Sequence, residues 1–512
     1  MEKIKRILVS VYNKDGLLPL IKTLCRYNEN LEIISTGGTQ QFLEENNIRV
    51  IPVETITDYP SILGGRVKTL HPKIFGGILN RSNNKDDMHD VKKFNIHNID
   101  MIIVDLYPFE ETLKKTTNVQ EIIEKIDIGG VSLIRAAAKN YHDTLIIPAI
   151  SEFKNTITLL QETSGSSNID HRLTFAKKAF EVTSKYDLTI SRYFNKGFDK
   201  HKNNNPFLQQ NTEKSKQLRY GENPHQTAVF YGDLDSLFTQ LSGKELSYNN
   251  LLDIDAAINL MGEFNEKSFG VFKHNNSCGF ASDKNVKKAW KKALAGDPIS
   301  AFGGVLITNA NIDIETAQEI DKLFFEILIA PSFSNDVVEL LKTKKNRIIL
   351  LQKKNTKLED MTFRTVLNGI LCQGKDNITD SEKGELVSTT KTTKTQMDDL
   401  IFASKICKHT KSNAIVLVKD KQLLGAGCGQ TSRVDALKQA IVKAKKFGFS
   451  LENSVMASDA FFPFPDCVEI AHQEGVKAVI QPGGSKNDHL SIDYCNKNNI
   501  AMVLTGIRHF KH

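Results

Sequence analysis

A lysine and a histidine stand side by side in the stretch VFKHNNSCGF, residues 271–280. Val271 and Phe272 predict a short buried strand, so Lys273 and His274 follow where that strand ends. A neighbouring cation favours the neutral form of an imidazole, which suits a general base near pH 7. The pair therefore could transfer a proton, although a surface lysine beside a structural histidine is the commoner reason for such a dipeptide.

Two glycine-containing stretches nearer the start of the chain predict anion sites. The predicted strand Leu31–Ser35 leads into the run TGGT (36–39) and then a helix, which points free N–H groups and a helix N-terminus at one place. A glycine pair also serves an ordinary tight turn. The second stretch, Gly64–Pro72, holds Arg66 and Lys68 in a segment expected to be extended, with both side chains on one face. A solvated basic loop is the alternative for this stretch.

Alternating strands and helices position these residues. Between residues 5 and 150, predicted strands at Lys5–Val11 and Asp100–Leu106 and predicted helices at Asp15–Tyr27 and Ser132–Lys139 indicate an α/β fold with a doubly wound parallel sheet. Residues 197–216 are rich in Asn, Lys and Gln and are expected to link a domain at 1–196 to a second at 217–512. Strand–loop–helix units recur twice in the second half, which suggests two similar α/β subdomains, although no clean sequence repeat is visible.

The composition bounds the class of protein. With 512 residues, 40% hydrophobic and 25% charged, the chain is expected to form a globular protein of two or three domains. Its 7 cysteines are scattered and never in C-x-x-C spacing, which favours a reducing cytoplasm over a disulfide framework. No signal peptide and no membrane span are expected. The net charge of +7 would favour anionic small ligands as readily as nucleic acid.

Many separate motifs occur in one order along nearly the whole chain, and together they are highly specific. They are SVYNK, STGGT, GGRVKTLHP, LYPF, IDIGGV-x-LIRAAAKN, LRYGENPHQ, KH-x-x-x-CG, D-P-x-SAFGG, GQTSRVDA, SDAFFPF, QPGGS and TG-x-RHF. In this the chain resembles the bifunctional purine-biosynthesis family that combines AICAR formyltransferase with IMP cyclohydrolase.

The resemblance implies a fold, two reactions and a set of ligands. An N-terminal methylglyoxal-synthase-like parallel-sheet domain would close FAICAR to IMP. A larger domain of two cytidine-deaminase-like α/β subdomains would first transfer a formyl group from 10-formyltetrahydrofolate to AICAR. The zinc signature of the deaminases is missing, so no catalytic metal is expected. The family also implies a cytoplasmic homodimer with formyltransferase sites at the subunit interface.

The matching motifs carry the family's site residues to positions in this chain. In formyl transfer, His274 would be the general base, Lys273 would stabilise the transition state, and Asn413 would assist. In ring closure, Lys139 would move a proton, with Tyr107 and Asp127 beside it. AICAR-binding positions would be Arg219, Tyr220, Gly303, Glu326, Arg433, Phe461 and Arg508, and folate-binding positions Asp466, Ser485 and Lys486. The N-terminal nucleotide site would comprise Tyr12, Asn13, Lys14, Thr36, Gly37, Gly38, Thr39, Arg66, Val67, Lys68, Thr69, Asp105 and Ile128.

Three positions depart from the family pattern. Asp105 stands where Asn is usual, Ser277 where Pro precedes Cys-Gly, and Pro465 where Arg is often found. An extra carboxylate near an anionic nucleotide weakens binding unless a lysine offsets it. Asp105 therefore raises one alternative, a formyltransferase whose N-terminal domain binds nucleotide without cyclising it. An RNA-binding protein is disfavoured by dispersed lysines and the lack of an aromatic-basic strand. A methylglyoxal-synthase-like lyase would leave the second half idle.

Overall fold

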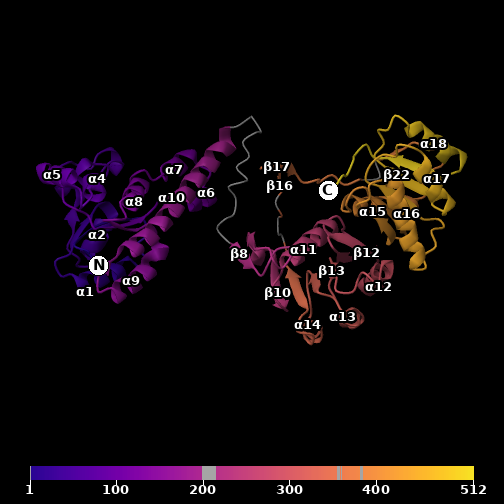
Figure 1. Cartoon of the computed structure of the whole chain (residues 1–512), viewed down its shortest axis with the longest axis horizontal. Coiled ribbons are helices and arrows are strands. Elements are labelled where there is room, and N and C mark those ends of the chain that lie inside the picture. Colours follow the sequence, from indigo (N-terminus) through magenta and orange to yellow (C-terminus); the bar gives the residue numbers. More distant parts are fainter. Residues whose placement is uncertain (1, 199–214, 355–357, 359, 381–383) are drawn as a thin grey trace. The chain divides into compact units, whose positions relative to one another are not determined.

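The computed structural model describes residues 2–198, 215–354, 358, 360–380 and 384–512. Contacts divide the chain into two compact units, Met1–Gln210 and Asn211–His512, drawn from indigo to purple and from magenta to yellow in Figure 1. The helix α10 (Ile169–Phe198) ends the described part of the first unit and β8 (Ser215–Leu218) begins that of the second. Residues 199–214 of the predicted linker lie outside the described residues. The linker and the domain limits at 196 and 217 stay predictions.

The N-terminal unit is built on a parallel sheet, as predicted. Its five strands, in spatial order, are β4 (Ile51–Pro52), β3 (Glu32–Ser35), β2 (Arg6–Val11), β5 (Met101–Asp105) and β6 (Leu145–Ile147). β2, β5 and β6 are apolar along nearly their whole length because both faces of a parallel sheet are covered by helices. A short antiparallel pair, β1 (Glu2–Lys3) with β7 (Ser166–Ser167), lies apart from this sheet.

Helices of the N-terminal unit pack in two groups. α1 contacts α9, whereas α8 contacts both α4 and α10. The helices are α1 (Leu17–Tyr27), α2 (Gly37–Glu45), α3 (Val53–Thr57), α4 (Pro72–Leu79), α5 (Lys85–Lys93), α6 (Phe109–Lys115), α7 (Val119–Ile123), α8 (Gly129–Lys139), α9 (Phe153–Glu162) and α10. The predicted helix at Ser132–Lys139 is confirmed, and it begins three residues earlier, at Gly129.

The C-terminal unit is built on one mixed sheet. Among the described residues, 12 strands lie in the order β10-β15-β14-β13-β11-β12-β20-β19-β21-β22-β23-β18. They are β10 (Phe238–Ser242), β11 (Ser268–Lys273), β12 (Asn276–Ser282), β13 (Val305–Thr308), β14 (Ile327–Ala330), β15 (Ile348–Gln352), β18 (Glu385–Leu386), β19 (Ile415–Lys419), β20 (Gln422–Gly427), β21 (Val455–Ser458), β22 (Ala478–Gln481) and β23 (Ala501–Leu504). Two separate hairpins pair β8 with β9 (Ala228–Tyr231) and β16 (Met361–Val366) with β17 (Gly369–Gly374).

The order of elements in this unit occurs twice. A helix leads into a β-hairpin, and three helix–strand steps then add three mutually parallel strands beside the hairpin's first strand. The first repeat uses α11 (Tyr248–Met261), α12 (Val286–Gly296), α13 (Ile314–Asp321) and α14 (Asn335–Lys342), and the second α15 (Lys394–Lys408), α16 (Arg433–Lys446), α17 (Asp466–Gln473) and α18 (Asp488–Lys497). The predicted recurrence is thus present. That each repeat forms a separate subdomain stays a prediction.

The two repeats share one core on one face of the sheet and keep separate cores on the other. Side chains from α11 and α15 pack in a single cluster that includes strand residues of both repeats. On the opposite face, α12 to α14 cover the first repeat and α16 to α18 cover the second. The repeats meet where β12 and β20 pair antiparallel. This pairing and the shared hydrophobic cluster together join the two repeats into one body.

Candidate active sites

The first candidate site lies at the carboxyl edge of the N-terminal sheet. The chain adds β3 and β4 on one side of β2 and then returns to add β5 and β6 on the other, so the strand order reverses between β2 and β5. Ligands of doubly wound sheets bind at such a reversal. Tyr12–Lys14 follow β2 here, Asp105 ends β5, and the Asn13 N–H donates to Asp105 Oδ2 at 3.0 Å. The fold therefore brings two of the predicted segments together.

Two lysine amines converge on the N-terminus of α2. A Cβ built on Gly37 would lie 3.0 Å from Lys68 Nζ, and one built on Gly38 would lie 3.9 Å from Lys14 Nζ. Thr36, the N-cap residue, is buried, and its hydroxyl has no hydrogen-bond partner among the described residues. Cations, free backbone N–H groups and an unpaired hydroxyl at one helix N-terminus can together hold a phosphate.

The N-terminus of α8 opens onto the same place. A Cβ built on Gly129 would lie 3.1 Å from Thr69 Oγ1, which joins the start of α8 to the segment that supplies Lys68. Ile128, just before this helix, is exposed. The predicted nucleotide-binding positions in residues 36–39, 66–69 and 127–128 thus adjoin one another.

The segment Arg66–Thr69 forms a turn, so the prediction that it is extended was wrong. The preceding Leu63–Gly65 forms a 3-10 turn in which both glycines have positive φ, 65° and 86°. Glycine adopts these positive φ values without steric cost, and they turn the chain instead of extending it. The side chains of the two cations consequently point to different places. The amine of Lys68 lies beside the start of α2, whereas Arg66 forms an ion pair with Glu124.

Two carboxyl groups lie beside this anion site and are partly buried. Burial raises the pKa of Asp105, and the Asn13 N–H and Lys14 oppose the rise. Burial also raises the pKa of Asp127, opposed by the N–H of Gly130, which donates to Asp127 Oδ1 at 2.7 Å. In the same environment burial lowers the pKa of Lys14. A raised pKa for an acid and a lowered pKa for an amine both favour the uncharged form, which suits groups that transfer protons.

An aromatic pair with a lysine against it borders the site. The rings of Tyr12 and Tyr107 meet edge to face with centroids 5.5 Å apart, and Lys125 Nζ lies 5.1 and 5.5 Å from the two centroids. The hydroxyl of Tyr186 accepts from the Asp127 N–H at 2.9 Å and donates to the Lys125 carbonyl at 2.7 Å. Neither Lys125 nor Tyr186 was predicted, because only the fold brings α10 and the segment before α8 to this place.

The second candidate site lies along one edge of the 12-stranded sheet. Because the parallel strands of the two repeats run in opposite directions, the amino ends of β13 and β14 face the same edge as the carboxyl ends of β21, β22 and β23. The predicted positions from Lys273 to Arg508 follow or precede strands at that edge. These are Lys273, His274, Gly303, Glu326, Asn413, Arg433, Phe461, Asp466, Ser485, Lys486 and Arg508.

The hairpin of β11 and β12 presents the lysine–histidine pair at this edge. His274 and Asn275 form its two-residue tip, both with positive φ (51° and 64°), as a type I′ hairpin requires. Lys273 Nζ donates to the carbonyls of Phe302 and Gly303 at 3.0 and 2.8 Å. His274 is exposed, so its ring is accessible from the edge of the sheet.

Asn413 and Arg433 belong to a polar network in the second repeat. Arg433 Nη2 donates to Asn413 Oδ1 at 2.9 Å, and its Nη1 donates to Ser458 Oγ at 3.2 Å and forms an ion pair with Asp459. The amide of Asn413 donates to the Gln430 carbonyl at 2.9 Å. These contacts fix both side chains before any ligand arrives, and Asp459 was not predicted.

Glu326 lies just before β14, at the amino end of that strand. It forms a salt bridge of 2.7 Å with Lys244, which follows β10 at the same edge. Arg219 stacks on its neighbour Tyr220 with a distance of 5.6 Å to the ring centroid. Their loop contacts the start of α11 through a hydrogen bond of 3.2 Å from Asn249 to the Glu222 carbonyl.

Loops at the carboxyl ends of β21 and β22 hold the predicted folate positions. Asp466 begins α17, and Asn487 beside Lys486 donates to the Pro463 carbonyl at 3.0 Å, which joins two of these loops. The Ser485 N–H donates to Asp488 Oδ2 at 3.0 Å. In the C-terminal tail, Arg508 stacks on Phe510 with 4.4 Å to the ring centroid.

Comparisons with known proteins identify the family of the chain. A family model described as MGS-like domain matches residues 16–132, and one described as AICARFT/IMPCHase bienzyme matches residues 137–443. The bifunctional purine biosynthesis protein PurH of Bacteroides thetaiotaomicron is 55% identical over 512 residues, 100% of this chain and 99% of that protein. The chain belongs to the AICARFT/IMPCHase bienzyme family.

Other members of the AICARFT/IMPCHase family match along their whole length as well. The PurH proteins of Caldicellulosiruptor saccharolyticus and Petrotoga mobilis are 44% and 46% identical, each over 99% of this chain and 100% of theirs. A solved chain titled "Crystal structure of ForH" is 27% identical over 37% of this chain and 99% of its own, with a TM-score of 0.33. At that TM-score the solved chain says nothing further about the fold.

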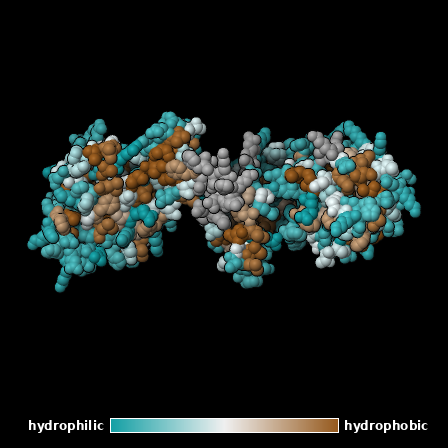
Figure 2. All heavy atoms as spheres, turned by 90° about the horizontal axis from the view of Figure 1, so that it is seen from above, coloured by the Kyte–Doolittle hydropathy of each residue, from teal (hydrophilic) through white to brown (hydrophobic). Residues whose placement is uncertain are grey.

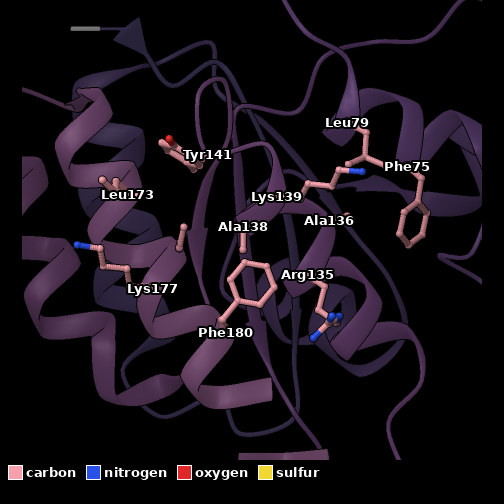
Figure 3. Close-up of a pocket in the computed structure, with 11 residues that line it drawn as sticks. Phe75, Leu79, Arg135, Ala136, Ala138, Lys139, Tyr141, Leu173, Lys177 and Phe180 are labelled. Atoms are coloured by element: carbon pink, nitrogen blue, oxygen red, sulfur yellow. The ribbon is translucent and has the colours of Figure 1, made fainter. Parts of the chain in front are cut away.

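The fold does not bring Lys139 to the other cyclohydrolase positions of the same chain. Gly129 begins α8 beside the anion site, whereas Lys139 ends it, which separates the two by roughly 15 Å at 1.5 Å per residue. Lys139 instead lines a largely apolar cavity of about 600 Å³ (Figure 3). Its walls are formed by Phe75, Leu79, Arg135, Ala136, Ala138, Lys139, Tyr141, Leu173, Ala176, Lys177 and Phe180.

The described residues contain neither a candidate metal site nor a candidate membrane-spanning helix. No group of three or more His, Cys, Asp or Glu side chains in that part of the chain is placed to hold a metal ion. None of the helices so described is both long and apolar enough to cross a bilayer.

Proposed function

We propose that this enzyme of purine biosynthesis carries out two consecutive reactions, one in each unit. In the C-terminal unit, the 5-amino nitrogen of AICAR bonds to the formyl carbon of 10-formyltetrahydrofolate, which releases tetrahydrofolate and gives FAICAR. In the N-terminal unit, the carboxamide nitrogen of FAICAR attacks its formyl carbon, and loss of water gives IMP. The observation that carries the proposal is the shared edge of the 12-stranded sheet, where the lysine–histidine hairpin meets the loops of the second repeat.

His274 is the general base in formyl transfer. An aromatic amine beside a carboxamide is a poor nucleophile, so it must lose a proton as it attacks, and an exposed imidazole at a hairpin tip can accept that proton. Lys273 uses two of its three N–H bonds on the Phe302 and Gly303 carbonyls, which leaves one for the oxyanion of the tetrahedral intermediate. The same two bonds fix the amine in place before the reaction.

The remaining edge positions bind the two substrates. Arg433 is already oriented by Asp459, and Asn413 by Arg433 and the Gln430 carbonyl, so both contact AICAR without a further loss of side-chain freedom. Arg219, Tyr220, Gly303, Glu326, Phe461 and Arg508 complete this site, and Asp466, Ser485 and Lys486 bind the folate. Arg508 and Arg219 are the cations suited to the phosphate, since guanidinium binds phosphate in a bidentate manner.

Ring closure takes place at the anion site of the N-terminal sheet. The phosphate of FAICAR binds between Lys14, Lys68 and the start of α2, and Asp127 with Tyr107 lies beside the base. Because the attacking and attacked groups belong to one molecule, holding them in the reactive geometry provides much of the rate. Asp105 does not prevent nucleotide binding, since its carboxylate accepts the Asn13 N–H and lies near Lys14.

The enzyme acts as a cytoplasmic homodimer, in which Lys139 reaches the anion site of a second copy. Two features support this: Lys139 is too far along α8 to serve its own chain, and the cavity around it is apolar with Leu79 and Phe180 partly exposed. Hydrophobic side chains also gather on the visible surface of the N-terminal unit in Figure 2. An exposed apolar patch is typical of a protein interface.

The alternatives receive no support from the comparisons. Full-length relatives carry the bifunctional name, whereas a formyltransferase alone, a lyase or an RNA-binding protein would not match both family models in order.

The direct test supplies purified enzyme with AICAR and 10-formyltetrahydrofolate and follows tetrahydrofolate and IMP separately. We expect His274→Ala to abolish release of tetrahydrofolate, and Lys139→Ala to release it while FAICAR accumulates. Tetrahydrofolate without enzyme-dependent IMP would refute ring closure. Neither product from active substrates would refute both assignments.

A further inference from the structure

The repeat in the C-terminal unit places two β-hairpins in equivalent positions. The first, β11 with β12, has His274 and Asn275 at its tip, with φ of 51° and 64°. The second, β19 with β20, has Asp420 and Lys421 at its tip, with φ of 50° and 53°. Each tip therefore has two residues with side chains in the left-handed region, a conformation that costs energy for His274 and Lys421 in particular.

An aspartate on the helix before each hairpin supplies that support. Asp253 on α11 accepts a hydrogen bond of 2.7 Å from the Asn275 N–H through Oδ1. Asp399 on α15 accepts from the N–H groups of Asp420 and Lys421, each at 2.8 Å. In both repeats, a carboxylate thus bonds to the backbone of the tip rather than to a side chain.

The two aspartates occupy the same position in their helices. Asp253 lies six residues after the N-cap Ser247, and Asp399 lies six residues after the N-cap Thr393. Both helices begin with a capping box, so their first turns are fixed in the same way. The helix start and the aspartate therefore fix each hairpin tip relative to the helix that precedes it.

Only one of the two tips carries chemistry. The first lies at the edge that holds the formyltransferase positions. The second lies at the opposite edge, because the two repeats run in opposite directions. There Lys421 Nζ forms a salt bridge of 2.7 Å with Glu266. The second hairpin is thus a structural copy of the first, with no histidine at its tip.

We propose that Asp253 is a positioning residue for formyl transfer, which holds the tip of the β11–β12 hairpin so that His274 meets the amine of the substrate. The proposal rests on the assignment of His274 as the base and adds a residue that does not itself touch the reacting atoms. A base displaced by about 1 Å can lose up to a hundredfold in rate, so loss of the clamp acts on turnover more than on binding.

The experiment compares Asp253→Ala with Asp399→Ala, which removes the same clamp from the tip without chemistry. Both variants are measured in the whole enzyme for kcat and KM of formyl transfer, and for IMP formation from supplied FAICAR. Amide hydrogen exchange of peptides spanning 270–278 and 416–424 reports each tip independently of activity.

We expect Asp253→Ala to lower kcat for formyl transfer at least tenfold, with KM for AICAR changed less than about threefold. Exchange should rise in the 270–278 peptide only. Asp399→Ala should raise exchange at 416–424 and leave kcat within about twofold of the unmodified enzyme. Asp253→Asn keeps an acceptor oxygen for the Asn275 N–H and should retain more activity than Asp253→Ala. IMP formation from FAICAR should not change in any variant.

Two results would overturn the proposal. One is faster exchange at 270–278 in Asp253→Ala with kcat unchanged, and the other is an equal loss of kcat in Asp253→Ala and Asp399→Ala. If the unmodified enzyme transfers no formyl group, the assigned reaction fails, whereas the exchange experiment still decides whether Asp253 holds the tip.

Discussion

At the scale of single residues, Glu263 shows how a partly buried acid can stabilise the C-terminal unit. It accepts hydrogen bonds from Lys408 at 2.6 Å and His409 at 3.0 Å, and also one from Thr379. Burial acts to raise the pKa of Glu263, but these bonds outweigh it and lower the pKa to about 2. Because Glu263 follows α11 and Lys408 ends α15, the group joins the two repeats.

Replacing this acid should weaken the unit in a pH-dependent way. A folded-state pKa below the ordinary 4.5 means that the stabilisation is present above pH 4.5 and is lost as the pH falls toward 2. We expect Glu263→Gln to cost about 1–2 kcal/mol at pH 7, since water screens part of the interaction. Urea unfolding followed by fluorescence of Trp290, the single tryptophan, measures this unit alone. An equal cost at pH 7 and pH 3 would contradict the assignment.

His509 gives a prediction of opposite sign. Burial acts to lower the pKa of His509, but its contacts with Asp380 and Asp376 outweigh burial and raise it above the ordinary 6.5. The stabilisation is therefore complete below pH 6.5 and is lost as the pH rises through the folded-state pKa. The difference in unfolding free energy between the unmodified enzyme and His509→Ala should shrink from pH 6 to pH 9. A constant difference would show that His509 acts through packing alone.

The same titration should affect substrate binding through the adjacent Arg508. Nδ1 of His509 lies 2.6 Å from Asp376 Oδ2, which holds the C-terminal tail in place. The backbone N–H of His509 donates to the Asp459 carbonyl at 3.0 Å. As the imidazole loses its proton, the tail loosens, and we expect KM for AICAR to rise above neutral pH. His509→Ala should show a raised KM with little further dependence on pH in this range.

At the scale of elements, both repeats depend on a glycine in the second strand of the hairpin. A Cβ on Gly279 of β12 would lie 1.9 Å from the Ala293 carbonyl of α12, and one on Gly425 of β20 would lie 2.3 Å from the Ala440 carbonyl of α16. The absence of a side chain therefore lets each helix pack directly on its hairpin.

We expect Gly279→Ala to force α12 away from β12 and to cost about 1–3 kcal/mol. The matched control is Gly369→Ala in β17, where a Cβ would meet its nearest neighbour at 3.9 Å. Thermal unfolding monitored at Trp290 should show a lower midpoint for the first variant and little change for the second. Equal midpoints would mean that the backbone at Gly279 can shift without cost.

Elements were easier to predict from the sequence than their contacts. Lys5–Val11, Leu31–Ser35 and Asp100–Leu106 were placed to within a residue of β2, β3 and β5 because strands buried on both faces are uniformly apolar. The prediction of an extended segment at Arg66–Thr69 was wrong because the glycine pair before it adopts a turn that residue type alone does not specify. The recurrence of strand–loop–helix units in the second half was predicted, but no repeat of residues was visible, since the repeat is expressed in caps and turn conformations and not in residue identities.

The candidate sites were predictable where a motif is continuous in sequence. The hairpin with His274, the run at residues 36–39 and the start of α8 all lie where the motifs indicated. Lys125, Tyr186, Asp253 and Asp459 were missed because each contacts a segment far away in the chain, and no local signal distinguishes them from surface or core residues.

At the scale of the whole molecule, the separation of Lys139 from Asp127 gives a test of the dimer. If each cyclohydrolase site takes Asp127 from one copy and Lys139 from the other, neither Lys139→Ala nor Asp127→Asn alone should close FAICAR. Mixing the two after subunit exchange creates heterodimers with one intact site, so about a quarter of the activity should return. Formation of IMP from FAICAR measures this. No recovery, with exchange verified by labelled subunits, would refute a shared site.

The antiparallel pairing of β12 with β20 has a consequence for how the chain tolerates change. An approximate two-fold axis between these strands gives the sheet two geometrically matched edges. Selection for turnover acts on the edge with His274, whereas the opposite edge, with Asp420 and Lys421 at its tip, needs only to fold. Sequence drift should therefore concentrate at the second tip, which is also the place to attach a fluorophore or a surface tether without disturbing the reaction.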